Sequence, residues 1–121
     1  RAGEIGIENV YYDETCEEVV IQFVTKISEN EISKIILKHN DTDISSYITA
    51  RSIETGGKVV KLSVPFENLT SLTEYVVEIP IGFADVYGQV LVNTVFEKFM
   101  TGEGPRVDAK SYIYQNDYEN Q

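Results

Sequence analysis

The stretch Leu69-Thr70-Ser71-Leu72-Thr73-Glu74-Tyr75-Val76-Val77-Glu78-Ile79 joins a polar loop to a segment in which apolar and polar residues alternate. Tyr75, Val77 and Ile79 fall on one face of that segment, and Glu78 falls on the other. A period of two residues is typical of a β-strand with one buried face. We therefore predict a strand over residues 75–81, entered from a loop.

Comparable segments recur at short, even spacing along the chain. The further expected strands cover residues 4–8, 19–26, 34–39, 47–53, 60–66 and 90–100. In the last of these the alternation is imperfect, and a bulge near Asn93-Thr94 would restore it. Between the second and third strands, Ser28 is placed to cap one helical turn. About seven strands without long helices predict an all-β sandwich.

Composition supports the same fold class. The chain has 14 Val and 13 Ile against 5 Leu and 4 Ala, a balance that favours pleated sheets over helices. Its net charge of −10 argues against nucleic acid or an anionic membrane as a partner. No apolar run of 18 residues occurs, so we expect no membrane-spanning helix.

The organisation expected is one domain over residues 1–102, which is close to the commonest domain size. Gly102-Glu103-Gly104-Pro105 ends it, and residues 103–121 are a linker or the start of a following domain. The opening Arg1-Ala2-Gly3 lies directly before a strand-like segment, as in a piece of a longer polypeptide. The single Cys16 excludes an internal disulfide.

Two local motifs predict how strands are joined. Leu69 lies six residues before Tyr75, the spacing of a tyrosine corner, in which the phenol bonds a backbone group of the preceding loop. Further on, Asp85 can cap a turn by accepting backbone N–H bonds, and Gly88 supplies the positive φ that such a turn needs. All four residues are expected to be structural.

The segment from Tyr75 through the Asp85-to-Gly88 loop to Phe99-Met100-Thr101 resembles the end of bacterial immunoglobulin-like domains of the S-layer (SbsA-like) type. The resemblance covers roughly residues 4–101 and implies an immunoglobulin-like Greek-key β-sandwich. It also implies a non-catalytic spacer, scaffold or adhesion-supporting module, extracellular or at the cell surface, with neighbouring domains as partners. Fibronectin type III is the second resemblance, although the chain has no Trp for that family's core position.

Catalytic chemistry has little support in the sequence. His39 is the single histidine, and without a second His or Cys partner it cannot form a zinc site with nitrogen and sulfur ligands. No Gly-x-Ser-x-Gly elbow accompanies it for a Ser-His-Asp triad. We expect no enzymatic activity and no organic cofactor.

Calcium is the one metal that the sequence suggests. Asn40-Asp41-Thr42-Asp43 sets oxygen ligands at alternate positions, so Asp41 and Asp43 are candidate Ca²⁺ ligands. A second acidic cluster spans residues 13–18. Neither stretch has the Gly and distal Glu of an EF-hand loop, and a turn-forming cluster is the alternative reading.

Eight tyrosines raise the possibility of carbohydrate binding, because sugar rings stack on exposed aromatic rings. Tyr11 and Tyr12 must point to opposite faces of a strand, and we take Tyr12 and Tyr87 as the candidate contacts. Tyr112 and Tyr114 near the end of the chain are further candidates. A carbohydrate-binding module beside a polysaccharide-degrading enzyme, with a cell-wall or extracellular polysaccharide as partner, is thus the alternative function.

Overall fold

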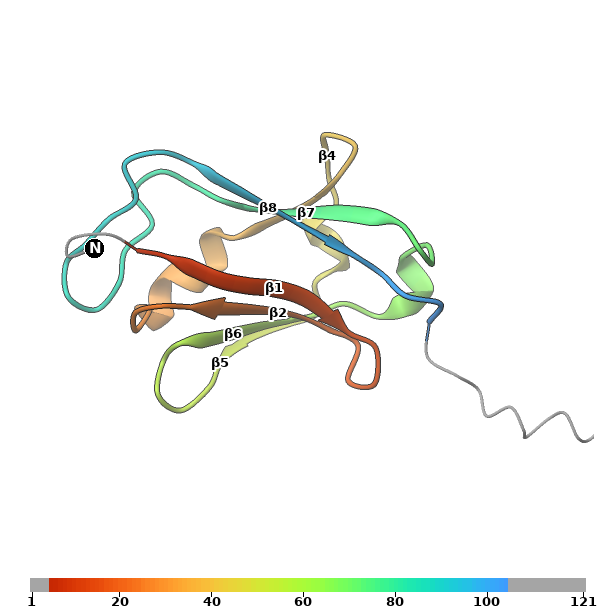
Figure 1. Cartoon of the computed structure of the whole chain (residues 1–121), viewed down its shortest axis with the longest axis horizontal. Coiled ribbons are helices and arrows are strands. Elements are labelled where there is room, and N and C mark those ends of the chain that lie inside the picture. Colours follow the sequence, from red (N-terminus) through yellow and green to blue (C-terminus); the bar gives the residue numbers. More distant parts are fainter. Residues whose placement is uncertain (1–4, 105–121) are drawn as a thin grey trace, which may run out of the picture.

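The computed structural model describes residues 5–104, which form two antiparallel four-stranded sheets packed face to face (Figure 1). Within these residues the strands are β1 Ile7–Asp13, β2 Glu18–Phe23, β3 Ile36–His39, β4 Thr42–Asp43, β5 Ala50–Ile53, β6 Val59–Ser63, β7 Glu74–Ile79 and β8 Val95–Met100. Short 3-10 helices lie in the connections: η1 Glu29–Lys34, η2 Ser45–Tyr47 and η3 Phe66–Asn68. The predicted all-β class is confirmed.

The order of the strands defines an immunoglobulin-like Greek-key sandwich. The first sheet runs β1-β2-β6-β5 and the second runs β4-β3-β7-β8. This is the strand arrangement of constant-type immunoglobulin domains, to which the two-residue β4 adds a short edge. The described residues therefore contain eight strands where the sequence predicted about seven.

The core consists of the inward faces of both sheets. In β6, Val60 and Leu62 are fully buried, and in β7, Val77 and Ile79 are too. Each such side chain contributes roughly 1.5–3 kcal/mol through removal from water. Because apolar and polar residues alternate strictly in these two strands, both could be predicted from the sequence.

The first strand lies further along the chain than predicted. It begins at Ile7 and continues to Asp13, whereas the expected strand covered residues 4–8. Its pairing with β2 is irregular between Ile7 and Asn9, which is the mark of a β-bulge. The bulge changes which side chains face inward, so the local alternation of residues 4–8 does not continue into the rest of the strand.

The last strand is shorter than predicted. β8 begins at Val95 and pairs with β7 without a register shift, so the expected bulge at Asn93-Thr94 is absent from it. Val90 instead forms an isolated bridge with Ala84 inside the β7–β8 connection. Some backbone N–H and C=O groups of residues 90–94 form hydrogen bonds within that connection, and these residues do not extend the sheet.

The region between β2 and β5 contains more irregular structure than expected. Lys34 belongs to η1, and the third strand begins only at Ile36. η2 precedes β5, so the strand predicted over residues 47–53 begins at Ala50. Both strands therefore begin later than predicted, because the polar segments directly before them form the 3-10 helices η1 and η2.

The chain enters and leaves the sandwich at opposite ends (Figure 1). We call the N-terminal pole the end made of residues 5–6, 24–34, 54–58 and 80–94, which are joined by backbone hydrogen bonds, Gly6 among them through its carbonyl. We call the C-terminal pole the end made of residues 13–18, 64–73 and 101–104, which are likewise joined.

Candidate binding loop

The connection between β7 and β8, residues 80–94, carries a group of exposed apolar side chains. Their relative exposures lie between 47% and 75%, and they are Ile81, Val86, Tyr87, Val90 and Val92. Single exposed apolar residues are ordinary on a protein surface, whereas several on one loop make it a candidate contact surface. We name this segment the binding loop.

Two buried side chains anchor the binding loop in the core. Phe83 is fully buried and stacks on Phe23, with 5.8 Å between the ring centroids. Leu91 is also buried, and its amide donates to the carbonyl of Phe83 at 2.9 Å. The amide of Gly82 donates to the carbonyl of Leu91 at 2.8 Å, which closes the base of the loop.

Asp85 shapes the tip of the binding loop. Its Oδ1 accepts hydrogen bonds from the amides of Tyr87 at 2.8 Å and Gln89 at 2.9 Å, and the Gln89 side chain donates to Oδ2. Burial to 4% exposure raises the pKa of Asp85, but the bonds from Gln89 and Tyr87 outweigh this, so its pKa lies below the ordinary value. Gly88 turns the chain at a φ of 87°, a conformation that strains other residues.

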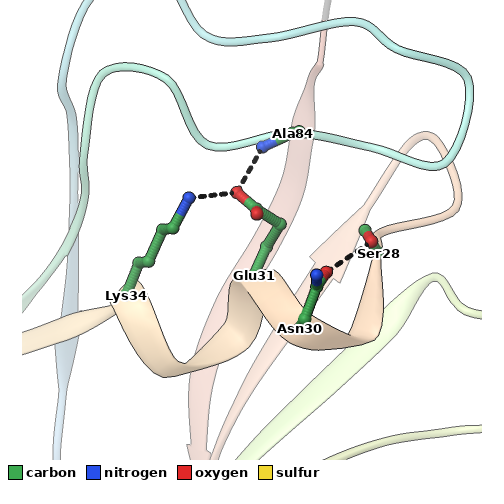
Figure 2. Close-up of polar contacts among 5 residues, drawn as sticks. All are labelled: Ser28, Asn30, Glu31, Lys34 and Ala84. Carbon is green, nitrogen blue, oxygen red and sulfur yellow. Dashed lines mark hydrogen bonds and ion pairs between the residues drawn. The ribbon is translucent and has the colours of Figure 1, made fainter.

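Glu31 of η1 fastens the binding loop from the side (Figure 2). Its Oε1 accepts a hydrogen bond from the Ala84 amide at 3.0 Å and from Lys34 Nζ at 2.9 Å. The bond from Lys34 lowers the pKa of Glu31, burial raises it, and the Ala84 bond lowers it further, so the carboxylate stays ionised.

Ser28 precedes η1 without the predicted side-chain cap. Its hydroxyl donates to Asn30 Oδ1 at 2.7 Å, as Figure 2 shows, and the Glu31 amide donates to the carbonyl of Ser28 at 2.9 Å. The Glu31 side chain is thereby free to reach the binding loop.

The binding loop is also hydrogen-bonded to the segment that follows β2 of the first sheet. The Val86 amide donates to the carbonyl of Lys26 at 2.9 Å, and Ile27 forms a bridge with Asp85. Ile27 in turn donates to the carbonyl of Gly57 at 2.8 Å, in the β5–β6 turn. A loop held from several elements loses little conformational entropy on contact with a partner.

The tyrosine-corner residues lie at the C-terminal pole. The Thr70 amide donates to the phenol oxygen of Tyr75 at 2.8 Å, and Leu69 is buried beside it. Thr101 closes the same corner, because its hydroxyl donates to the carbonyl of Thr70 at 2.6 Å. The ring of His39 packs on Tyr75 with centroids 4.8 Å apart, so the one histidine is part of the packing.

Of the two tyrosines selected for carbohydrate contact, the structure places one inside. Tyr12 is 8% exposed and its hydroxyl donates to the carbonyl of Val64 at 2.7 Å, while Tyr11 is the member of the pair that faces outward. Burial, followed by the charges of Glu17 and Glu14, raises the pKa of Tyr12. The choice of Tyr12 was therefore wrong, because its ring faces the core. Tyr87 is 67% exposed on the binding loop.

Asp41 lies in the β3–β4 turn, and Asp43 is the last residue of β4. Asn40 and Asp41 adopt positive φ values of 49° and 68°, and Asp43 Oδ1 accepts a bond from the Ser45 amide at 2.8 Å. The hydrogen bonds from Ser45 lower the pKa of Asp43. Across residues 5–104, no three His, Cys, Asp or Glu side chains are grouped as a metal site. Binding of Ca²⁺ by this pair stays a prediction.

The second acidic cluster also forms a turn. Asp13 Oδ1 accepts bonds from the amides of Thr15 at 3.0 Å and Cys16 at 3.1 Å. Glu17 Oε1 accepts a bond from the Phe66 amide at 2.8 Å, which ties this turn to η3. Tyr112 and Tyr114 lie outside the described residues.

Sequence reasoning did not find Glu31 as a loop anchor or Arg51 as a fastening for η1. Arg51 Nη1 donates to the carbonyls of Ile32 at 2.7 Å and Ile35 at 2.8 Å, at the end of η1. The Ile32 carbonyl also accepts a hydrogen bond from the Ile35 amide at 3.3 Å. The contacts of Glu31 and Arg51 join residues far apart in the sequence, so no local pattern signals them.

Three solved structures share this fold at low identity. Two are of the S-layer protein SbsC: a crystal structure of rSbsC(31-844), with a TM-score of 0.67, and one of its domains 1–6, with a TM-score of 0.65. Each is 14% identical, and the match covers 81% of this chain and 14% of that one. The third is native alpha-2-macroglobulin from Escherichia coli, spanning domains MG0-NIE-MG1. It has a TM-score of 0.64 at 10% identity and covers 82% of this chain and 32% of that one.

These likenesses establish the fold. The chain spans about one seventh of the S-layer protein chains that it matches. No protein-family model matches the sequence, and no curated protein matches it. Within residues 5–104, no helix has the length and apolar character needed to cross a membrane.

Proposed function

We propose that this chain is a non-catalytic immunoglobulin-like spacer of a secreted or cell-surface multidomain protein. The observation that carries the proposal is the position of the chain's entry and exit. The start of β1 lies at the N-terminal pole and the segment that follows β8 lies at the C-terminal pole, with the length of the sandwich between them (Figure 1). A module connected in this way holds its neighbours apart along its own long axis.

The strand geometry suits a load-bearing spacer. Force applied between the two ends pulls on β1 from its Ile7 end and on β8 from its Met100 end. Each of these strands is paired along its length, β1 with β2 and β8 with β7. Antiparallel hydrogen bonds lie perpendicular to the strands, so this load acts on many of them together.

The solved structures support the same proposal. Their matching domains belong to longer chains, one of them an S-layer protein, in which a domain of this fold has neighbours. By analogy, the partners of this chain are the domains beside it in the same polypeptide, and its location is the cell surface. The strong negative charge adds colloidal solubility to such a module.

Single-molecule force spectroscopy on residues 1–121, held by its two ends, tests the proposal. We expect one cooperative unfolding event that releases about 30 nm of chain, from about 3.6 Å per extended residue over the sandwich. Gradual extension without a distinct event would contradict a load-bearing role.

The exposed ring of Tyr87 favours a second candidate, a carbohydrate-binding module. The ring lies on a loop whose backbone is bonded to Asp85, and an exposed aromatic ring on such a loop is suited to stacking on a sugar face. Affinity electrophoresis against cell-wall and plant polysaccharides tests it. Retardation of the wild-type chain that disappears in Tyr87→Ala would support this candidate, and no retardation by any polysaccharide would reject it.

A further inference from the structure

β8 forms one edge of the second sheet. Within residues 5–104 it pairs only with β7, in a register that runs from Val95 to Met100 without a shift. The other edge strands are less regular, because β1 carries a bulge, β4 has two residues and β5 has four. β1 lies beside β8 on this side of the sandwich but belongs to the first sheet (Figure 1). An edge strand without a bulge is a template on which another strand can pair.

Alternate residues of β8 direct their backbone groups at this edge. The Thr101 amide, directly after β8, donates to the carbonyl of Thr73, directly before β7, at 3.0 Å. Because the direction of N–H and C=O groups alternates along a strand, Phe96, Lys98 and Met100 direct theirs away from β7. These groups have no partner among the strands that the structure describes. The edge therefore offers a row of donors and acceptors at the spacing of an extended backbone.

The same three residues carry the side chains on the outer face of β8. Phe96 and Met100 are 59% and 62% exposed, and the Lys98 side chain between them is 72% exposed. Lys98 pairs with Glu74 at 3.5 Å. Both groups are open to water, where such a pair contributes little and leaves the ammonium group accessible. The outer face of this edge is thus a cation between two apolar side chains.

The charges of β8 disfavour a second copy of the same strand as its partner. Side chains directly opposite each other in an antiparallel pair lie on the same face of the sheet. If Phe96 pairs with Met100 of the second copy, Lys98 lies opposite Lys98 of the second copy. If Phe96 pairs with Lys98 of the second copy, the two Glu97 residues lie opposite each other. Like charges directly opposite are destabilising, so the edge selects against itself and favours a strand of different sequence.

We propose that β8 binds an extended peptide segment by antiparallel strand addition, with an acidic residue opposite Lys98 and apolar residues two positions to either side. Main-chain hydrogen bonds to β8 supply affinity, and contacts with its outer side chains supply selectivity. The carboxylate is complementary in charge to Lys98, and the apolar residues pack on Phe96 and Met100. This site lies along the side of the sandwich, so the binding goes beyond the spacer function and leaves both poles to neighbouring domains.

Titration of the full, isotope-labelled chain with short capped peptides, followed by NMR, tests the proposal. One probe is Thr-Val-Thr-Glu-Thr-Val-Thr, and the other has Lys in place of the central Glu. At about 0.15 M salt, which screens charge beyond about 8 Å, the net charge of −10 is largely hidden from either peptide. We expect the acidic peptide to bind about fivefold more tightly, with its largest shifts on the amides of Phe96, Lys98 and Met100.

Reversal of charge distinguishes this site from general contact with the surface. Lys98→Glu should reverse the preference, so that the Lys peptide binds more tightly than the acidic one. Lys61→Glu is the matched control, because Lys61 is an ion-paired surface lysine on the other sheet, and this variant should keep the wild-type preference. The amide spectrum of each variant shows whether it is folded.

Methylation of the peptide nitrogens tests the main-chain bonds. In the antiparallel pairing, the N–H groups of the two Val residues and the central Glu face β8. Methylation of these nitrogens should abolish binding, whereas methylation of the Thr nitrogens on either side of the Glu should leave it intact.

Four results would overturn the proposal: equal affinity of the two peptides, shifts centred away from β8, an unchanged preference in Lys98→Glu, or no binding by either peptide up to about 2 mM. The force that unfolds a single tethered molecule does not depend on any of them. Failure of this proposal is therefore distinguishable from failure of the spacer function.

Discussion

The Glu31 carboxylate accepts a hydrogen bond from the backbone amide of Ala84, 53 residues further along the chain, at 3.0 Å. Through this bond η1, in the connection from one sheet to the other, fixes the loop that joins the last two strands (Figure 2). The same carboxylate is paired with Lys34, which keeps it ionised and therefore a stronger acceptor. The exposed apolar side chains of the binding loop are thus carried on a rigid support.

Replacing Glu31 should loosen the binding loop. In Glu31→Ala the Ala84 amide loses its acceptor, and a half-buried unpaired amide costs roughly 1–3 kcal/mol. Amide hydrogen exchange should become faster in residues 81–92 and stay unchanged in β6. Glu29→Ala is the control, since Glu29 lies exposed on the same helix. Equal exchange in both variants would show that Glu31 does not hold the loop.

Asp85 should make stability depend on pH. Its folded-state pKa lies below the ordinary value, so on acidification the unfolded chain takes up a proton first and stability falls as pH drops below about 4. Asp85→Asn removes the charge from bonds to two amides and should cost about 1–3 kcal/mol at neutral pH. Urea denaturation from pH 3 to pH 7 measures both effects. A variant with the wild-type pH dependence would exclude Asp85 as their source.

Tyr75→Phe should remove the bond to the Thr70 amide while keeping the ring in the core. The expected loss is about 1 kcal/mol of unfolding free energy, the usual net value of one hydrogen bond. Tyr87→Phe removes a phenol from an exposed ring and should leave stability within about 0.5 kcal/mol of the wild type. Chemical denaturation compares the two, and equal stabilities would mean that the corner bond contributes nothing.

Arg51→Met should destabilise the junction of η1 and β5. The change removes the side-chain donor from the carbonyls of Ile32 and Ile35, of which the first keeps its bond from the Ile35 amide, and should cost about 1–3 kcal/mol. Lys61→Met breaks a surface ion pair with Glu54, at 2.7 Å, and should cost less stability than Arg51→Met, because solvent screens an exposed pair. Thermal unfolding should give Arg51→Met a lower melting temperature than Lys61→Met. The reverse order would contradict the importance of Arg51.

Much of the sandwich could be predicted because its signals are local. The alternation in β6 and β7 requires only neighbouring residues, and so do turns such as that of Gly88 and Asp85. The ends of a strand were harder to predict where the strand begins at a bulge, as β1 does. Which of Tyr11 and Tyr12 faces inward follows from that register, and a strand's own sequence does not reveal it.

The supports of the binding loop could not be predicted for a different reason. Glu31 meets Ala84 and Arg51 meets Ile32 only after the sheets have packed. In the sequence, Glu31 is one of twenty acidic residues and Arg51 lies in a weak strand pattern. Of the exposed apolar residues in this loop, Ile81, Val90 and Val92 were likewise counted toward strands, because hydrophobicity alone does not separate a buried strand from an exposed loop.

The direction in which the domain resists force tests the spacer account most directly. Cys16 is a free, exposed thiol at the C-terminal pole, and Gly104 at the same pole bonds Glu14 at 3.3 Å. Tension between the two ends of the chain loads β1 and β8 along their lengths, whereas tension between Cys16 and the end of the chain peels β8 from β7 one pair at a time. The account predicts a clearly higher unfolding force in the first geometry. Equal forces in both geometries, or a higher force on peeling, would contradict it.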